Sequence, residues 1–242
     1  MSFVAAVITT ACRIYNSINK LHSSRLTMQG ATPEVQEIGE RAACRYTDIS
    51  DHLVTLYAEA LSVNPSLIVE LGVREGESTF AFERAARLSN AHLVSVDLND
   101  CTIRSSYLKW SFVKQDDIIF AGQFPDWCSS QKIPPDIDVL FIDTSHLYEN
   151  TLEELRVWMP YLSAKGKIIL HDTNMKKIYR RADGSLYLGW DNARGVIRAL
   201  EETLGVRFNE VHDFVTCGQG MAYTALGPLQ WPDSPGKTLA IG

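Results

Sequence analysis

Two short apolar runs in this chain each end in side chains that can ionise. Asp143 and His146 follow one run, and His171 and Asp172 follow the next run along the chain. Carboxylate oxygens are the ligands that Mg²⁺ prefers, and a nearby imidazole can remove a proton. If the runs are neighbouring parallel strands, their ends lie about 5 Å apart. We therefore expect Asp143 and Asp172 to bind a divalent cation and His146 to act as a base, a combination that ionises a hydroxyl group.

Each of these side chains also has an ordinary structural explanation. Asp143 could cap a helix that begins at Leu147, and a single His is more often a hydrogen-bonded core or surface residue. Four such groups at two neighbouring strand ends are more ionisable chemistry than a structural strand end needs. We therefore favour a functional site over four separate structural roles.

A glycine-punctuated turn follows an earlier apolar run and has the spacing of a nucleotide-binding loop. It reads E-x-G-x-x-x-G-x-S, in which the letters stand for Glu70, Gly72, Gly76 and Ser78. Glycines let backbone amides and a helix start approach such a ligand closely. A dinucleotide fingerprint has the different spacing G-x-G-x-x-G. The alternative is a tight strand-to-helix turn that binds nothing.

Acidic residues end the next two predicted strands. Asp97 can accept hydrogen bonds from both ribose hydroxyls of a nucleotide-like cofactor, although an N-cap would also place an acid there. Asp116 could accept from an adenine amine, although Asp117 is adjacent and either carboxylate could face solvent instead. The predicted cofactor-binding residues are Glu70, Gly72, Gly76, Ser78, Asp97, Asp116 and Asp143.

The elements that must position these residues alternate between strands and helices, which predicts a parallel sheet covered on both faces. Strands are expected at Leu67–Leu71, His92–Asp97, Trp110–Lys114, Asp138–Asp143, Lys167–His171, Val206–Val211 and Gly220–Leu226. Helices are expected at Ser78–Leu88, Tyr148–Tyr161 and Asn192–Leu204. The predicted fold is α/β, with a doubly wound, mostly parallel seven-stranded sheet of the Rossmann-like type. Its first, fourth and fifth strands should be neighbours.

Three regions lie outside this alternation. Residues 1–62 show helical spacing and are predicted to form a helical N-terminal extension. The sheet domain is placed at 63–228 and a Pro/Gly-rich tail at 229–242. The connection at 173–188 is long and rich in Lys, Arg and Tyr, which favours a lid over the site against a flexible insertion.

Composition limits the classes of function. The chain has 242 residues, 45% hydrophobic and 21% charged, and a net charge of −6 with a pI near 5.5. A generally basic surface is missing, which argues against a nucleic-acid partner. Five scattered cysteines without C-x-x-C spacing favour reduced thiols and a cytoplasmic protein. No apolar run is long enough to span a membrane. The helical N-terminal part makes a homodimer or a larger homo-oligomer plausible.

The glycine turn resembles the S-adenosylmethionine (SAM) loop of class I methyltransferases. The stretch I-D-x-x-H-x-Y-E at 142–149 and the stretch G-x-I-I-x-H-D at 166–172 are similar to the metal-dependent cephalosporin-hydroxylase-like and macrocin O-methyltransferase group. The resemblance covers about half of the chain. It implies SAM and Mg²⁺ (or Mn²⁺) as cofactors, Asp143 and Asp172 as metal ligands and His146 as the base. Described members carry Glu at position 171, where this chain has His171, which could ligate through nitrogen or instead hydrogen-bond the substrate or a water beside the metal.

The expected function is therefore a SAM-dependent, divalent-metal-dependent O-methyltransferase. The resemblance implies a small-molecule hydroxyl as the acceptor, on a sugar or another natural product. A catechol-type phenol O-methyltransferase is an alternative, because it also places a metal at these strand ends. A nicotinamide-dependent oxidoreductase and a non-catalytic SAM-binding module are alternatives from other classes.

Overall fold

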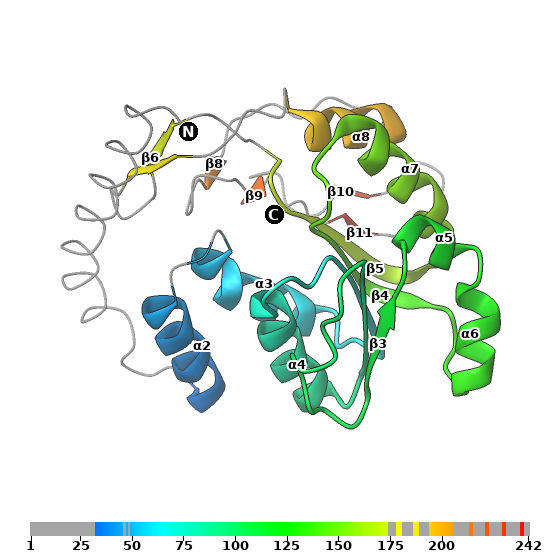
Figure 1. Ribbon diagram of the computed structural model, residues 1–242, viewed down its shortest axis with the longest axis horizontal. Coiled ribbons are helices and arrows are strands. Elements are labelled where there is room, and N and C mark those ends of the chain that lie inside the picture. The colour runs from blue at the N-terminus through cyan, green and yellow to red at the C-terminus, as the bar shows by residue number, and fades with distance from the viewer. Residues whose placement is uncertain are drawn as a thin grey trace.

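A computed structural model shows a parallel five-stranded sheet between two layers of helices (Figure 1). The structure describes residues 32–45, 47, 49–173 and 194–205, together with the backbone of six short strands between 178 and 239. The strands of the sheet are β1 (Leu67–Leu71), β2 (His92–Asp97), β3 (Trp110–Lys114), β4 (Ile137–Ile142) and β5 (Leu162–Leu170). Their order is β3-β2-β1-β4-β5, so β1 pairs with both β2 and β4. This order confirms the predicted doubly wound arrangement.

One face of the sheet packs against the N-terminal helices α2 (Pro33–Cys44), η1 (Ser50–His52) and α3 (Leu53–Ser62), and against α4 (Glu77–Ser89). The opposite face packs against α5 (Asp117–Ala121), α6 (Phe124–Gln131), α7 (Tyr148–Trp158), η2 (Met159–Tyr161) and α8 (Gly195–Leu204). Neighbouring strand residues alternate between these cores: Ile68 packs in the first and Val69 in the second. Because both faces are covered, the strands are continuous apolar runs.

Backbone hydrogen bonds fix the carboxyl ends of the three central strands beside one another. The amide of Asp143, the residue after β4, donates to Leu71 O at the end of β1 over 2.8 Å. The amide of His171, the residue after β5, donates to Ile142 O at the end of β4 over 3.0 Å. The residues that follow these strands therefore start from one common edge of the sheet.

The sequence predicts a sheet of seven strands, whereas the main sheet of the described residues has five. The predicted strand at 206–211 lies outside the described residues. The region of the other, at 220–226, contains β9 (Met221–Ala222), which pairs antiparallel with β8 (Asp213–Phe214) in a separate two-stranded sheet. Two further short pairs are β6 (Ile178–Arg180) with β7 (Leu186–Leu188), and β10 (Leu229–Gln230) with β11 (Thr238–Leu239).

The expected lid at 173–188 is described only at Thr173 and in β6 and β7, so most of that prediction lies outside the described residues. Residues 1–31 of the expected helical extension also lie outside them, whereas α2, η1 and α3 occupy its remaining part. Within the described residues, no helix combines the length and apolar character needed to cross a bilayer.

Candidate metal and cofactor site

Three side chains meet at the common edge of β4 and β5. The imidazole Nε2 of His146 lies 3.0 Å from Asp172 Oδ2 and 3.8 Å from Asp143 Oδ1. One donor atom from each of the three residues fits within a group whose members are all within 4.8 Å of one another. Asp172 is buried, and Asp143 and His146 are partly buried. The predicted convergence of these residues is therefore what the structure shows.

The backbone at two of these residues adopts a conformation that side chains rarely allow. His146 has φ 58° and Asp172 has φ 57°, both in the left-handed region. Such conformations cost a non-glycine residue on the order of 1 kcal/mol and persist where the surrounding structure enforces them. They turn both side chains back toward Asp143. Strained residues of this kind concentrate at functional sites.

The arrangement fits a divalent cation. Around an ion with bonds of about 2.1 Å, adjacent ligands lie about 3 Å apart and opposite ligands about 4 Å apart. The separations of 3.0 and 3.8 Å from His146 Nε2 to the two carboxylates match this range. Two carboxylates with one imidazole are a donor set that Mg²⁺ or Mn²⁺ accepts, with water or substrate completing the shell.

His171 occupies a different place from the one that the sequence suggested. Its Nδ1 lies 3.0 Å from Asp143 Oδ1 and 3.4 Å from Asp172 Oδ1, and its ring is 1% exposed. An ionised carboxylate only accepts hydrogen bonds, so Nδ1 donates. His171 therefore bridges the two expected ligands from behind, and the three-residue ligand group excludes it.

These contacts shift both partners toward their charged forms. Burial opposes charge on His171, but the carboxylates of Asp172 and Asp143 outweigh it and raise the pKa of His171 well above 6.5. Burial likewise opposes charge on Asp143, but His171 lowers the pKa of Asp143 to about 2. Without a metal, the Asp143 carboxylate is thus paired with an imidazolium on His171.

A second imidazole, from outside the predicted site, lies against His171. The ring of His52, at the end of η1, meets the His171 ring edge-on at a centroid distance of 5.6 Å. Burial, followed by the neighbouring charge on His171, lowers the pKa of His52 to about 3, so this ring is neutral. No motif surrounds His52 in the sequence, and only its packing in the fold reveals it.

The glycine turn runs beside this edge, and its first glycine is required by the protein backbone. Gly72 has φ 90°, and a Cβ there would lie 2.0 Å from the carbonyl oxygen of Asp143. Gly76 has φ 77° and is the N-cap of α4, where a Cβ would lie 2.9 Å from Arg104 Cβ. The turn can therefore pass against the backbone of Asp143 only because residue 72 is glycine.

Glu70 and Ser78 are placed inside the fold and contact each other. The Glu70 carboxylate accepts hydrogen bonds from Ser78 Oγ and Ser95 Oγ, each over 2.5 Å, and from Thr79 Oγ1 over 2.8 Å. Burial raises the pKa of Glu70 to about 7, although these hydroxyls oppose the rise. The two residues tie β1 to α4 and β2, so they shape the turn from beneath.

Asp97 and Asp116 also make contacts within the protein. Asp97 Oδ2 accepts from the amides of Val73 over 2.8 Å and Arg74 over 3.1 Å, and Oδ1 accepts from the Asn99 amide. Burial opposes ionisation of Asp97, but these amides outweigh it and lower its pKa. Asp116 caps α5 by accepting from the Ile119 amide over 3.0 Å. Asp116 is therefore the N-cap of α5, a role that the sequence had suggested as an alternative for Asp97, whereas Asp97 orders the glycine turn.

An ion-pair cluster that sequence reasoning missed holds α2 against the start of α4. Glu77, the first residue of α4, accepts from Arg41 Nε over 2.8 Å and Nη2 over 3.0 Å, and from Arg45 Nη1 over 2.5 Å. Arg84, about two turns further along α4, pairs in the same way with Glu37, which lies about one turn before Arg41 on α2. The acid–base spacing within α2 could have signalled a charged face, but not its partner.

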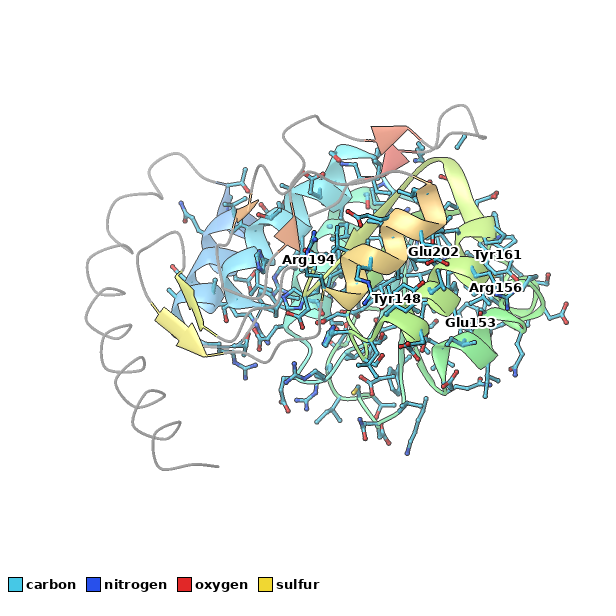
Figure 2. The ribbon with its side chains drawn as sticks, turned by 90° about the horizontal axis from the view of Figure 1, so that it is seen from above. Tyr148, Glu153, Arg156, Tyr161, Arg194 and Glu202 are labelled. Atoms are coloured by element: carbon cyan, nitrogen blue, oxygen red, sulfur yellow. The ribbon has the colours of Figure 1, made fainter. Side chains whose placement is uncertain are left out.

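The loop that carries His146 is also fixed from the side of α8. A Cβ on Gly195, the first residue of α8, would lie 2.8 Å from the Tyr148 amide nitrogen and 3.0 Å from His146 O. Figure 2 shows Tyr148 and Glu202 together where α7 packs on α8, and the Tyr148 hydroxyl donates to the Glu202 carboxylate. The Arg198 guanidinium lies 4.6 Å above the Tyr148 ring.

Comparisons with known proteins agree with this fold. Residues 69–173 match a family described as a methyltransferase domain. The O-methyltransferase from Bacillus cereus in complex with SAH has a similar structure, with a TM-score of 0.52 and 14% identity over 80% of this chain and 87% of that one. This likeness shows a shared fold, and it confirms the predicted Rossmann-like α/β architecture. No curated protein matches the chain.

Other solved structures are more distant. The MycE methyltransferase from the mycinamycin biosynthetic pathway, in complex with Mg and SAH, has a TM-score of 0.45 and 15% identity over 59% of this chain. This chain spans 38% of the MycE chain. CalS11, a calicheamicin methyltransferase, has a TM-score of 0.43 and 14% identity over 73% of this chain and 86% of that one.

Proposed function

We propose that this chain, a class I methyltransferase by the match of its residues 69–173, methylates a hydroxyl group of a small molecule with SAM and a divalent cation. The observation that carries the proposal is the group of Asp143, His146 and Asp172 at the joined ends of β4 and β5. Two of its members have left-handed backbone, and the glycine turn passes against the third.

In this proposal, Asp143 and Asp172 hold Mg²⁺ or Mn²⁺, and the bound cation would lower the pKa of a hydroxyl in its shell. His171 keeps both carboxylates oriented through Nδ1 and replaces the usual acid at its position as an orienting group. The glycine turn, ordered by Asp97, would receive SAM. In this proposal, Asp97 and Asp116 act on the cofactor site indirectly, through the backbone segments whose amides they bind.

His146 is proposed as the base. During methyl transfer, the acceptor oxygen forms a bond to the methyl carbon while that carbon loses its bond to the sulfonium sulfur. The bond electrons return to sulfur and leave S-adenosylhomocysteine (SAH), and the hydroxyl proton goes to the imidazole of His146. A positioned base of this kind contributes about 10²–10⁴-fold to the rate.

The acceptor class follows the resemblance of I-D-x-x-H-x-Y-E and G-x-I-I-x-H-D to metal-dependent enzymes that act on sugars and other natural products. A panel of nucleotide-linked sugars, glycosides and catechols, assayed for methyl transfer from labelled SAM, separates this class from the phenol alternative. A cytoplasmic location and a homo-oligomeric state remain predictions from the sequence; fractionation and light scattering measure them.

The metal part is tested by titrating Mn²⁺ into the protein in the presence of SAH, by calorimetry. Asp143→Asn and Asp172→Asn should each weaken Mn²⁺ binding by at least about 10-fold, because each removes one charged ligand. Asp126→Asn is the matched control, since Asp126 is an exposed acid on α6. Wild-type Mn²⁺ affinity in both site variants would remove the metal from the proposal.

The assignment of His146 as the base needs its own test. Its Nε2 also lies close enough to the oxygens of Asp143 and Asp172 to be a ligand of the same cation. As a base, His146→Ala should retain SAH affinity and Mn²⁺ affinity within about 3-fold while kcat falls by about 10²-fold or more. A loss of Mn²⁺ affinity of about 10-fold or more would instead make His146 a metal ligand.

A further inference from the structure

The position of the His171 ring determines how the two expected metal ligands are held. Its Nδ1 donates toward Asp143 over 3.0 Å and lies 3.4 Å from Asp172, so one ring orients both carboxylates. The other ring nitrogen, Nε2, is buried and makes no hydrogen bond to any described residue. Among the described residues, ring packing rather than a second hydrogen bond must therefore fix the rotation of His171 about its side chain.

His52 supplies that packing. Its side chain is 2% exposed, and its ring stands at 77° to the His171 ring with centroids 5.6 Å apart. The ring of His146 is the next imidazole, at 6.4 Å and 68°. His146 lies on the side of the metal ligands, whereas His52 approaches from the helical layer of η1 and α3.

The element that carries His52 is itself held rigidly. The His52 amide donates to Ile49 O over 3.0 Å. Ser50 Oγ accepts from the Thr47 amide over 2.8 Å and donates to Arg45 O over 2.5 Å. The following turns of α3 bury Leu53 and Leu56 completely. A ring carried by such an element can hold a neighbouring ring in one orientation by packing against it.

We propose that His52 is a positioning residue of the metal site, which acts through His171. Its ring keeps Nδ1 of His171 directed at Asp143 and Asp172, and so keeps the two carboxylates in the arrangement that binds a divalent cation. His52 lies outside the segment 69–173 that matches the methyltransferase family, so the N-terminal helices become part of the site. This inference rests on the proposed function of the carboxylates as metal ligands.

The test compares three variants of the full chain. His52→Ala removes the ring, His52→Phe keeps an aromatic ring without the nitrogens, and Leu56→Ala truncates a fully buried side chain one helix turn away while His52 is kept. Calorimetric titration with Mn²⁺ in the presence of SAH should show binding weakened by about 10-fold or more in His52→Ala. Binding in His52→Phe and Leu56→Ala should stay within about 3-fold of the wild type, since both retain a ring beside His171.

A metal-independent measurement accompanies the titration. In the metal-free protein, the proton on His171 Nδ1 should give a downfield NMR resonance, because it donates to a carboxylate. That resonance should persist in His52→Phe and Leu56→Ala and disappear by exchange in His52→Ala. Persistence in His52→Ala, or an equal loss of Mn²⁺ affinity in Leu56→Ala, would overturn the inference.

The two measurements separate this inference from the proposed function. If the wild type does not bind Mn²⁺, the metal assignment of Asp143 and Asp172 fails, and the NMR comparison still decides whether His52 positions His171. If the wild type binds Mn²⁺ and His52→Ala binds it equally well, the metal site stands and the role of His52 is refuted.

Discussion

Two buried carboxyl groups, those of Glu154 and Asp117, lie behind the loop that follows β4, and we expect them to make the stability of this protein depend on pH. Glu154 on α7 is fully buried and accepts from Asn150 Nδ2 over 2.7 Å and from the hydroxyl of Thr144, the residue after Asp143. Three buried polar atoms nearby lack a hydrogen bond to any described residue: Glu154 Oε2, Asp117 Oδ2 and Trp158 Nε1. One proton on Glu154 would satisfy all three, because Asp117 could then accept from both neighbours.

The pKa shifts of Glu154 and Asp117 also indicate that Glu154 keeps a proton in the folded chain. Burial, with repulsion from Asp117 second, raises the pKa of Glu154 to about 9, and burial raises the pKa of Asp117 to about 6. Below about pH 4.5, Glu154 is protonated in both the folded and the unfolded chain. Between about pH 4.5 and 9 only the folded chain keeps the proton, so the free energy of unfolding falls as the pH rises.

The magnitude follows from that window. One proton changes the free energy of unfolding by about 1.4 kcal/mol per pH unit, so the interval from about pH 4.5 to 7 corresponds to about 3 kcal/mol. A domain of this size is stable by about 5–15 kcal/mol, so this is a large fraction. Glu154→Gln carries an uncharged donor at all pH values. It should match the wild type near pH 5 and exceed it by about 4 kcal/mol near pH 8.

Urea unfolding at pH values from 5 to 9, followed by circular dichroism, measures the effect. The matched control is Glu149→Gln, because Glu149 is an exposed acid on the same helix and its removal should leave the slope unchanged. Parallel pH profiles for the wild type and Glu154→Gln would refute the shared proton. A steeper decline in Glu154→Gln than in the wild type would also refute it.

Three further predictions concern the backbone around the site. Gly72→Ala should destabilise the chain by more than about 3 kcal/mol in urea unfolding, since its Cβ meets backbone, whereas Gly205→Ala, with open space at φ 65°, should cost about 1 kcal/mol. Gly195→Ala should lower kcat, because its Cβ displaces the loop that carries His146, while the SAH affinity measured by calorimetry stays unchanged. Glu77→Gln should speed amide hydrogen exchange in α2 but not in β1, because α2 loses its charged anchor.

The sheet could be predicted from the sequence because burial on both faces leaves a strong signal. The strand β1 is buried at every position and apolar at every position except Glu70, and its length distinguishes it from a helix. The start of β5 was predicted five residues late, because Ser163 and Lys165 are polar and the pairing with β4 shifts register there. The short helices α5 and α6 have too few turns for a periodic signal and were not predicted.

The candidate site could be predicted as a set of residues but not as a geometry. Strand order follows from the alternation of elements, so the meeting of Asp143 with Asp172 could be inferred. The left-handed backbone of Asp172 and His146 could not, because neither is a glycine and no local pattern requires it. With those two conformations, His146 rather than His171 belongs to the group of possible ligands with Asp143 and Asp172.

The cofactor residues show a different limit. The spacing of the glycine turn correctly places Glu70, Ser78 and Asp97 around one loop, but it does not say which way a side chain points. The hydroxyls that satisfy Glu70 come from α4 and from β2, and their convergence is a property of the fold. Asp97 resembles a ribose acceptor in sequence, yet in the structure both of its oxygens accept from backbone amides.

The N-terminal helices pack on the sheet through an apolar core, and two polar contacts near the candidate site also join them to it. Glu77 is 4% exposed, so removing Arg41 and Arg45 would leave a buried carboxylate without a partner, which costs several kcal/mol. The favourable position of an acid at the start of α4 only partly offsets that cost. The second of these contacts is the packing of His52 on His171, so separation of α2 and α3 from the sheet would disturb both the glycine turn and the edge that carries Asp143 and Asp172. The helical segment and the site must therefore fold as one unit.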